Sequence, residues 1–573
     1  KENGYNVISW QQVIDAENGK GTLPDNAVLL SFDDGYETMY NVVFPLLKAY
    51  NYPAVFAPVT GWLDTPANQK IAYADKMLDR SVFATWSQVK EMEQSGLVEI
   101  ASHTHNLHNG INANPSGGQL PSVIAPEYKN GKYETEDAYK NRLKSDFTRT
   151  VQTLVNHIGK KPRVMVWPYG QFNDVAVQIA RQAGMPHYFS LGEKIVNKVG
   201  DKHIGRLLLN AETDLNTVKN YLDGIDESKQ IQRVLHVDLD YVYDADKAQQ
   251  AKNLDKLIDR IYRYGVTTVY LQAFSDPDGD GVADALYFPN KYLPVRDDIF
   301  GRIAWQLQTR AGVQVYAWMP VLAFDLRKSV KEAEYVIDSR TGKPSTKAYL
   351  RLSPYNKQNV EIIKSIYNDL SFYAKFNGIL FHDDAFLTDF EGAEGNHAEG
   401  MVSPQAKQKT QDLIQLTHQL TDALKPYFLR GSYSLKTARN LYASVITNPN
   451  AEEWLAQNLK TLTDNYDTTA IMAMPYMENE QPISQKEAYQ WFASLIENVK
   501  AQAPLEKVLF EFQAVNWRTQ KPIPESELID WMTLLQKNHI YSYGYYPDNF
   551  LTNQPDMNKM KPYFSVNTNA GKK

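Results

Sequence analysis

The stretch Ala27-Val28-Leu29-Leu30-Ser31-Phe32-Asp33-Asp34-Gly35 joins an apolar run to two adjacent carboxylates and a glycine. The run from Ala27 to Phe32 predicts a buried strand, and Gly35 predicts a turn directly after it. Successive side chains of a strand point to opposite sides, so Asp33 and Asp34 serve one site only if this turn lets both converge. The stretch therefore predicts a sheet whose strand end carries polar chemistry.

Around this stretch, the first part of the chain alternates short apolar runs with amphipathic helices. A long helix is predicted where Tyr139, Leu143, Phe147, Val151, Val155 and Ile158 recur at helical spacing, and a shorter one over 174–184. Residues 109–135 are rich in Asn, Gly, Pro and Ser and predict a long functional loop. The alternation indicates an α/β layer or barrel. Its other predicted strands are Ala54 to Val59, Leu97 to Ser102, Val164 to Trp167 and Tyr188 to Leu191.

The second part of the chain repeats this alternation with stronger periodicity. A polar, helix-prone connector is predicted at 211–231, which gives domains at 1–210 and 232–573. Eight strand candidates, each followed by a helix or loop, indicate a (β/α)₈ barrel of the TIM type, whose site lies at the carboxyl ends of the strands. The candidates are Val234 to Val242, Thr268 to Phe274, Val313 to Leu322, Gly378 to Ala385, Leu435 to Tyr442, Ala470 to Tyr476, Val508 to Ala514 and Tyr541 to Tyr546.

The length and composition set limits on the class of protein. A chain of 573 residues is expected to form at least two domains. The net charge of -7, with no long basic run, argues against a nucleic-acid partner. No apolar run is long enough to span a bilayer. The absence of Cys excludes disulfides and thiolate metal sites, while the 36 Tyr residues are in keeping with a sugar-binding groove as well as a large core.

A second polar cluster, His103-Thr104-His105-Asn106-Leu107-His108, follows the predicted strand at 97–102. One Asp and two His form a ligand set that leaves room on a divalent ion for water. We expect Asp34, His103 and His108 as ligands, His105 as a rival ligand, and Asp33 as the general base. These ligands suit Zn²⁺ first, with Ni²⁺, Co²⁺ or Fe²⁺ as alternatives. The combination predicts metal-assisted hydrolysis, although Asp-Asp-Gly alone is most often a turn.

With the third element Val166-Trp167-Pro168-Tyr169-Gly170, these motifs resemble the polysaccharide deacetylase family (NodB homology, carbohydrate esterase family 4). The resemblance implies removal of an N-acetyl group from an amino sugar. It assigns the base to Asp33 and the metal ligands to Asp34, His103 and His108. It also implies that the backbone N–H of Tyr169 stabilises the oxyanion, with Trp167 and Pro168 beside the substrate.

Three departures from that family narrow the resemblance. The His pair is spaced i, i+5 instead of i, i+4, and Met165 stands where an Arg is usual, with Arg163 out of register. No convincing downstream Leu-x-His supplies the general acid, and His203 in a polar segment is the alternative. The chain is similar to two-domain poly-β-1,6-N-acetylglucosamine deacetylases of Gram-negative biofilm systems. In that group the deacetylase barrel is permuted, so we expect the general-acid His upstream of Lys1 and an incomplete N-terminal barrel in this chain.

That narrower likeness spans nearly the whole chain. It includes the motifs His236-Val237-Asp238-Leu239-Asp240-Tyr241, Asp276-Pro277-Asp278-Gly279-Asp280-Gly281, Phe381-His382-Asp383-Asp384 and Tyr545-Tyr546-Pro547-Asp548-Asn549-Phe550. It implies poly-β-1,6-N-acetylglucosamine as the substrate, an outer-membrane export porin as a partner, and no nucleic acid. A monomer in the periplasm is expected, from a precursor anchored in the outer membrane as a lipoprotein. The Asp276 motif resembles part of a calcium loop, but a turn is the simpler interpretation.

Acidic and aromatic residues are predicted at the mouth of the second barrel. Asp383 and Asp384 end a buried strand, and paired acids at strand ends suit glycosidic bond cleavage, so one of the two is expected to be the catalytic acid. Asp238, Asp240, Glu511 and Asp548 are expected to surround them, with a stacking wall of Trp318, Tyr476, Trp517, Tyr545 and Tyr546. The barrel is expected to bind the deacetylated polymer, whose units carry ammonium groups, and either to cleave it or only to hold it.

Three functions stay open at this point. The first is a metal-dependent deacetylase with a sugar-binding barrel. Whether this barrel also cuts the polymer, as the resemblance implies for some relatives, is open within this hypothesis. The second is a binding or export module whose N-terminal site is inactive. The third is a glycoside hydrolase whose N-terminal domain only directs it to the polymer.

Overall fold

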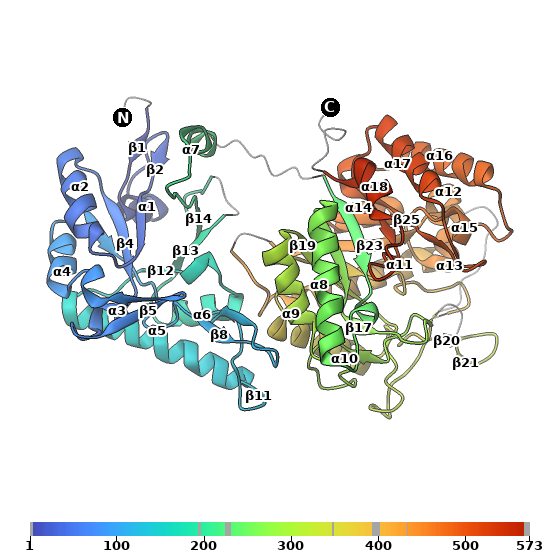
Figure 1. Cartoon of the computed structure of the whole chain (residues 1–573), viewed down its shortest axis with the longest axis horizontal. Helices are drawn as coiled ribbons and strands as arrows, with labels where there is room; N and C mark the ends of the chain where they lie inside the picture. Colours follow the sequence, from blue (N-terminus) through green and yellow to red (C-terminus); the bar gives the residue numbers. More distant parts are fainter. Residues whose placement is uncertain are drawn as a thin grey trace. The chain divides into compact units, whose positions relative to one another are not determined.

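The computed structural model describes residues 4–192, 196–223, 231–345, 349–391, 402–431 and 434–566. The chain divides into two compact units (Figure 1). The first unit comprises residues 1–229 together with 429–434, and the second comprises 230–428 and 435–573. Part of the connector predicted at 211–231 is the helix α7 (Leu215–Leu222), while residues 224–230 lie outside the described residues.

Two three-stranded parallel sheets form the centre of the first unit, in the orders β3-β4-β7 and β12-β13-β14. A parallel bridge between Ser102 and Met165 connects them. Four of the five predicted strands are confirmed within a few residues, and the fifth is divided between β2 and β3. The strands of the two central sheets are β3 (Ser31–Asp34), β4 (Ala54–Pro58), β7 (Val98–Ile100), β12 (Val164–Val166), β13 (His187–Leu191) and β14 (His203–Arg206). A separate pair consists of β1 (Asn6–Val7) and β2 (Ala27–Val28).

The helices of this unit bury the apolar faces that the sequence predicts. In α5 (Glu136–Ile158), Tyr139, Leu143, Phe147 and Ile158 are buried, and Thr135 caps the first turn. The predicted helix at 174–184 is α6 (Asp174–Gln182), followed by Gly184 in a left-handed conformation. The other helices are α1 (Trp10–Glu17), α2 (Phe44–Tyr50), α3 (Thr60–Asp64) and α4 (Trp86–Gln94).

The segment predicted as a long loop, residues 109–135, instead contains two short antiparallel hairpins. The first pairs β8 (Gly110–Asn112) with β9 (Gln119–Pro121), and the second pairs β10 (Tyr128–Lys129) with β11 (Lys132–Tyr133). A third hairpin, β5 (Lys70–Tyr73) with β6 (Lys76–Asp79), precedes α4. The strands are too short and too polar for their period to stand out in the sequence.

The second unit is a closed barrel of eight parallel strands, in which β15 pairs with both β16 and β28. All eight predicted strands are confirmed. They are β15 (Arg233–Val237), β16 (Thr268–Gln272), β19 (Gln314–Met319), β22 (Gly378–Phe381), β23 (Lys436–Tyr442), β24 (Thr468–Met472), β25 (Val508–Gln513) and β28 (Tyr543–Tyr546). Because strands and helices share one apolar core, the barrel is a packed TIM-type domain and not a pore.

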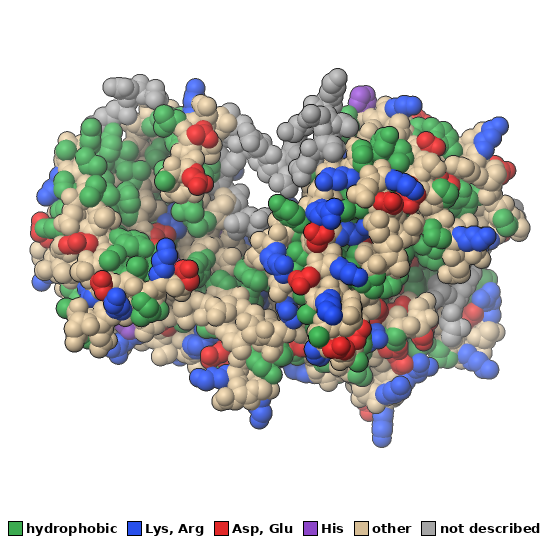
Figure 2. Space-filling view, viewed as in Figure 1, with side chains coloured by type: hydrophobic (Ala, Val, Ile, Leu, Met, Phe, Trp, Pro, Cys, Tyr) green, Lys and Arg blue, Asp and Glu red, His purple; other side chains and the backbone are tan. Residues whose placement is uncertain are grey.

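Helices surround this barrel (Figure 1). All but α18, which follows the last strand β28, lie between two strands in the chain, as the strand–helix alternation predicts. They are α8 (Lys247–Tyr264), α9 (Phe300–Gln306), α10 (Lys357–Tyr373), α11 (Pro404–Leu424), α12 (Ser444–Thr447), α13 (Glu452–Leu455), α14 (Leu459–Asn465), α15 (Pro475–Glu478), α16 (Gln485–Gln502), α17 (Glu525–Lys537) and α18 (Met557–Phe564). None of the described helices is both long and apolar enough to cross a membrane. In the face drawn in Figure 2, cationic and anionic side chains are interspersed on this unit.

One buried ion pair fixes the end of the barrel to its first helix. The guanidinium of Arg260 in α8 donates to both carboxylate oxygens of Asp548, with Nη2–Oδ1 2.6 Å and Nε–Oδ2 2.8 Å. Both side chains are almost fully buried. Asp548, which we expected beside the sugar, therefore has a structural role.

We predict that Arg260→Met destabilises the protein by about 3–5 kcal/mol, because it leaves a buried carboxylate without its counter-charge. The double variant Arg260→Met/Asp548→Asn should recover part of this loss. Urea-induced unfolding of the full chain measures both. Arg263→Met is the matched control, since its partner Asp259 is exposed and such pairs contribute at most about 1 kcal/mol. Equal losses for Arg260→Met and Arg263→Met would contradict the prediction.

Candidate metal centre and barrel mouth

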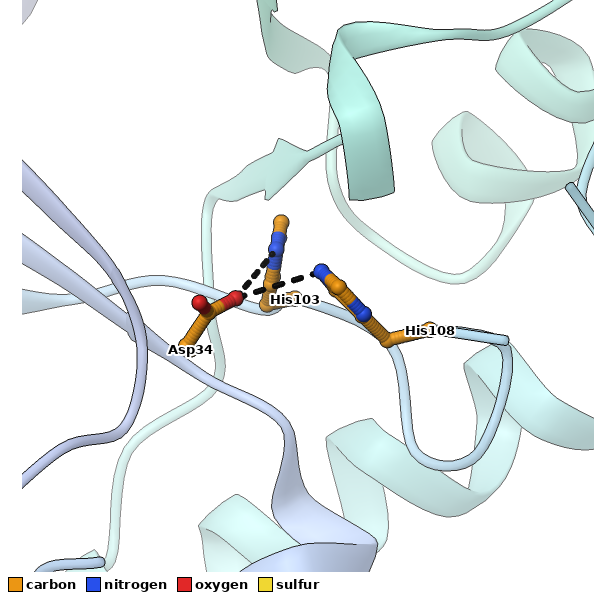
Figure 3. Close-up of side chains that lie close together, drawn as sticks. All are labelled: Asp34, His103 and His108. Atoms are coloured by element: carbon orange, nitrogen blue, oxygen red, sulfur yellow. Dashed lines mark ion pairs between the residues drawn. The ribbon is translucent and has the colours of Figure 1, made fainter. Parts of the chain in front are cut away.

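Three predicted ligands converge at the end of β3. Oδ1 of Asp34 lies 3.4 Å from Nε2 of His103 and 3.2 Å from Nε2 of His108. One ligand atom from each of the three residues lies within 4.8 Å of the others. Figure 3 shows the three side chains pointing toward one another, Asp34 from β3 and both His residues from the segment after β7. This donor set fits one divalent ion with positions left for water.

The backbone at Asp34 explains how two adjacent acids serve one region. Asp34 has a φ of 73° and Gly35 a φ of 105°, so the chain turns sharply where the strand ends. A non-glycine residue in the left-handed region is held there at a cost by its surroundings, and such residues gather at functional sites. The turn predicted from Gly35 is thus present and begins one residue earlier.

Hydrogen bonds orient two of the ligands. The ring of His103 contacts the carbonyl of Val166 through Nδ1 at 2.7 Å, which fixes Nδ1–H as the donor and leaves Nε2 to bind a cation. The hydroxyl of Tyr73 donates to Oδ2 of Asp34 at 2.9 Å. Burial opposes the charge on Asp34, but His103 and His108 outweigh it and hold the pKa of this carboxyl far below its usual value. Asp34 is therefore ionised, as a ligand must be.

Two features shape the segment between His103 and His108: the backbone conformation of Thr104 and the hydrogen bonds that Asp146 accepts from this segment. Thr104 has a φ of 70°, so the backbone bends in the left-handed region directly after His103. The carboxylate of Asp146 in α5 then accepts the N–H of His105 at 2.8 Å and of Asn106 at 2.7 Å. His105 is turned to Thr60, with Nδ1–Oγ1 2.9 Å, and lies outside the ligand cluster.

The expected base, Asp33, forms a two-pronged ion pair with Arg206 at the end of β14. Nη1–Oδ1 and Nη2–Oδ2 are both 2.8 Å, and Nη1 also donates to Ser31. Burial opposes the charge on Asp33, but Arg206 outweighs it and lowers the pKa of this carboxyl. Arg206 thus provides the cation that the sequence lacks at Met165, since Arg163 pairs with Glu99 instead.

The Trp-Pro-Tyr-Gly motif contributes one residue to the site and the rest to the core. Tyr169, with a φ of 59°, is 42% exposed and its ring centroid lies 4.5 Å from that of His108. Trp167 is fully buried against Phe172, and Pro168 is buried too. A substrate contact through their side chains was therefore the wrong prediction. His203 contacts Ser190 at 2.5 Å, apart from the ligand cluster.

In the barrel, the two adjacent acids after β22 differ in their surroundings. Asp383 accepts hydrogen bonds from Tyr349 and Tyr442 and lies 3.0 Å from Nε2 of His382. Burial opposes the charge on Asp383, but His382 and the two hydroxyls lower its pKa. Burial likewise opposes the charge on His382, but the neighbouring acids raise its pKa to about 10.

Asp384 is fully buried and accepts the backbone N–H groups of Val321, Leu322 and Ala323. Three backbone donors and no access to solvent make it a residue that holds the loop after β19. Our prediction of Asp384 as a catalytic acid was therefore wrong.

The other predicted acids also have distinct surroundings. Asp240 is bound by Arg296, Tyr287 and Ser275. Glu511 is buried between His236 and Asn440, each at 2.7 Å. Asp238 is buried, and its Oδ1 has no hydrogen-bond partner among the described residues. The carboxylate of Asp276 accepts three backbone N–H groups of its own turn, as the simpler interpretation of that motif predicts.

Three of the five predicted stacking residues lie together. The ring centroid of Tyr546 is 5.4 Å from Trp318 and 6.2 Å from Trp517. Tyr476 bonds Glu527 through its hydroxyl. Tyr545 is fully buried, and its hydroxyl donates to Asp548 at 2.6 Å, so its assignment to the stacking wall was wrong.

Several residues with evident roles were not predicted. Of these, Asp146 carried a sequence signal, because an acid on the apolar face of α5 beside Leu143 and Thr150 implies a buried partner. The others depend on contacts between distant segments: Tyr73 on Asp34, Arg206 on Asp33, and Tyr349 and Tyr442 on Asp383.

Comparisons with known proteins agree with this arrangement. A family model for polysaccharide deacetylase matches residues 20–188, and one for hypothetical glycosyl hydrolase family 13 matches 236–546. The chain is 40% identical over 592 aligned residues to a poly-beta-1,6-N-acetyl-D-glucosamine N-deacetylase of Escherichia coli (strain K12), covering 99% of this chain and 87% of that protein.

Two solved structures are also similar. A de-N-acetylase from Aggregatibacter actinomycetemcomitans is 67% identical, covering 38% of this chain and 84% of that chain, with a TM-score of 0.38. The PgaB (BpsB) glycoside hydrolase domain from Bordetella bronchiseptica is 38% identical, covering 59% of this chain and 100% of that chain, with a TM-score of 0.54.

We predict that Asp146→Asn weakens Zn²⁺ binding about 10-fold, because an amide oxygen cannot hold both backbone N–H groups as the carboxylate does. Competition with a chromogenic chelator measures the affinity. Asp137→Asn, an exposed acid on the same helix, is the matched control and should bind as the unaltered chain does. Unchanged affinity in Asp146→Asn would show that the loop keeps its geometry without this anchor.

Proposed function

Because the chain belongs to the poly-β-1,6-N-acetyl-D-glucosamine N-deacetylase family, we propose that its N-terminal unit removes N-acetyl groups from that polymer with one divalent ion. The observation that supports this most is the convergence of Asp34, His103 and His108 within 4.8 Å. Their two imidazoles and one carboxylate favour Zn²⁺, with Ni²⁺, Co²⁺ or Fe²⁺ as alternatives.

The residues of the site divide the work of amide hydrolysis. Asp34, His103 and His108 would hold the ion, which would supply a Lewis acid for the acetyl carbonyl and lower the pKa of a bound water. Asp33, held ionised by Arg206, accepts the proton of the attacking water. The peptide of Tyr169, whose ring lies against His108, donates its N–H to the oxygen that gains charge.

We propose that the barrel binds the polymer after some of its units have lost acetate. The wall of Trp318, Trp517 and Tyr546 offers rings for sugar faces, and nearby acids suit the ammonium groups of glucosamine. Delivery to an outer-membrane porin, a periplasmic location with a lipid anchor, and a monomeric state stay predictions from the family resemblance.

Cleavage of the polymer by the barrel is our second proposed function. It is favoured by Asp383, an ionised carboxylate at the end of β22 held by Tyr349, Tyr442 and His382. The likeness to a domain named as a glycoside hydrolase supports it. A base or nucleophile of this kind is one half of a glycosidase pair.

We predict that Asp33→Asn lowers acetate release from β-1,6-linked N-acetylglucosamine oligomers by about 10²–10⁴-fold, because it removes the general base. Its Zn²⁺ affinity should stay within a few-fold, whereas Asp34→Ala should lose both activity and metal. Asp137→Asn serves again as the control. Acetate release that survives both a chelator and Asp34→Ala would overturn metal dependence. No release by the metal-loaded precursor, which would carry the general-acid His expected upstream of Lys1, would favour the binding-module alternative.

The barrel is tested separately by Asp383→Asn. We expect shortening of de-N-acetylated oligomers, followed by mass spectrometry, to fall at least about 10²-fold while acetate release stays unchanged. Asp384→Asn cannot serve as the control, because it weakens the hydrogen bonds that hold the loop after β19 and should destabilise the barrel. If Asp383→Asn shortens chains at the original rate, Asp383 has no part in cleavage.

A further inference from the structure

Among the described residues, every acid predicted at the barrel mouth except one is matched by donors. Five contact a cation, an imidazole or a set of backbone donors: Asp240 with Arg296, Asp383 with His382, Asp384 with three backbone N–H groups, Asp548 with Arg260, and Glu511 with His236. Asp238 forms no ion pair with the described residues. A buried acid without a partner is costly, and such exceptions in native proteins call for a functional explanation.

Asp238 directly follows β15 and is only 8% exposed. Its Oδ1 has no hydrogen-bond partner among the described residues, and its Oδ2 is 3.5 Å from the hydroxyl of Tyr546. Burial, together with the negative charges of Asp240, Asp276 and Asp548, raises the pKa of Asp238 to about 8. Its carboxyl therefore keeps its proton at neutral pH, while that of Asp383 is ionised.

A continuous set of ring contacts connects these two acids. Tyr546, which bonds Asp238, lies 5.4 Å from Trp318, and Trp318 lies 5.3 Å from His382, the partner of Asp383. The indole Nε1 of Trp318 is buried and also lacks a partner among the described residues. The region between the acids thus has aromatic faces together with an unused donor and an unused acceptor, a combination that fits a sugar.

We propose that Asp238 is the general acid of a glycoside-cleaving site in the barrel, with Asp383 as its base. This inference rests on the proposed hydrolytic function. The carboxyl proton of Asp238 passes to the glycosidic oxygen as the bond from C1 to that oxygen breaks and its electron pair stays on the oxygen. A water forms the new bond to C1 and gives its proton to Asp383, and solvent exchange then returns a proton to Asp238.

The protonated and the ionised acid have different environments because, among the described residues, Asp383 forms an ion pair and Asp238 does not. Asp383 has the imidazolium of His382, whereas Asp238 has carboxylates as neighbours. Two carboxyl groups whose surroundings push them to opposite protonation states are the usual basis for assigning acid and base.

The test compares two substrates of the full chain: β-1,6-linked glucosamine oligomers, and the same oligomers with a dinitrophenyl leaving group that needs no protonation. For Asp238→Asn we expect natural cleavage to fall at least about 10²-fold, aryl cleavage to stay within a few-fold, and the loss of rate at high pH to disappear. Calorimetric affinity for the oligomer should stay within a few-fold. Asp278→Asn, an exposed acid beyond the next strand, is the matched control. Asp238→Glu, which keeps a carboxyl, should retain part of the natural cleavage.

Each other outcome has a defined meaning. If Asp238→Asn cleaves both substrates normally, or loses both equally, Asp238 is not the acid. If it loses affinity for glucosamine oligomers at unchanged turnover, Asp238 binds an ammonium group and the proposal is overturned. If the unaltered chain binds oligomers but cleaves neither substrate, the hydrolytic function fails and this inference fails with it. If Asp238→Asn does not fold, Asp238→Glu decides by its ratio of natural to aryl cleavage.

Discussion

Parallel pairing brings the carboxyl ends of neighbouring strands to the same edge of a sheet, and both units place their chemistry there. In the first unit, Asp33 and Asp34 end β3 of one sheet and Arg206 ends β14 of the other, and the guanidinium reaches Asp33 directly. In the second unit, Asp238 follows β15 and Asp383 follows β22. The common direction of the parallel strands therefore brings these acids to the same end of each unit.

The second constraint is the cost of a buried charge. Asp33, Asp240, Asp548 and Glu511 each contact a cationic or imidazole side chain. Since an uncompensated ion in the interior costs several kcal/mol, these pairs are needed for the fold as much as for function.

The eight barrel strands and most strands of the central sheets of the first unit were predictable, because apolar runs of strand length recur with helices between them. Asp34, His103 and His108 were predictable as a set from their residue types. The orientation of aromatic side chains was not: Trp167 and Tyr545 have the composition of a sugar site but face the core. Arg206 was missed because its strand is short and polar, and because its partner Asp33 lies on a strand that only tertiary structure brings near. The same holds for Tyr73 and Asp34.

The bend at Thr104 has a consequence for how such sites diversify. A single residue in the left-handed region bends the backbone directly after His103, while Asp146 keeps the two following peptides in place. The number of residues between the two His ligands can then change during evolution, whereas the position of the acid in the neighbouring helix must be kept. A search pattern built on ligand spacing would overlook such a variant, and one that pairs the ligands with a helical acid in the apolar face would recover it.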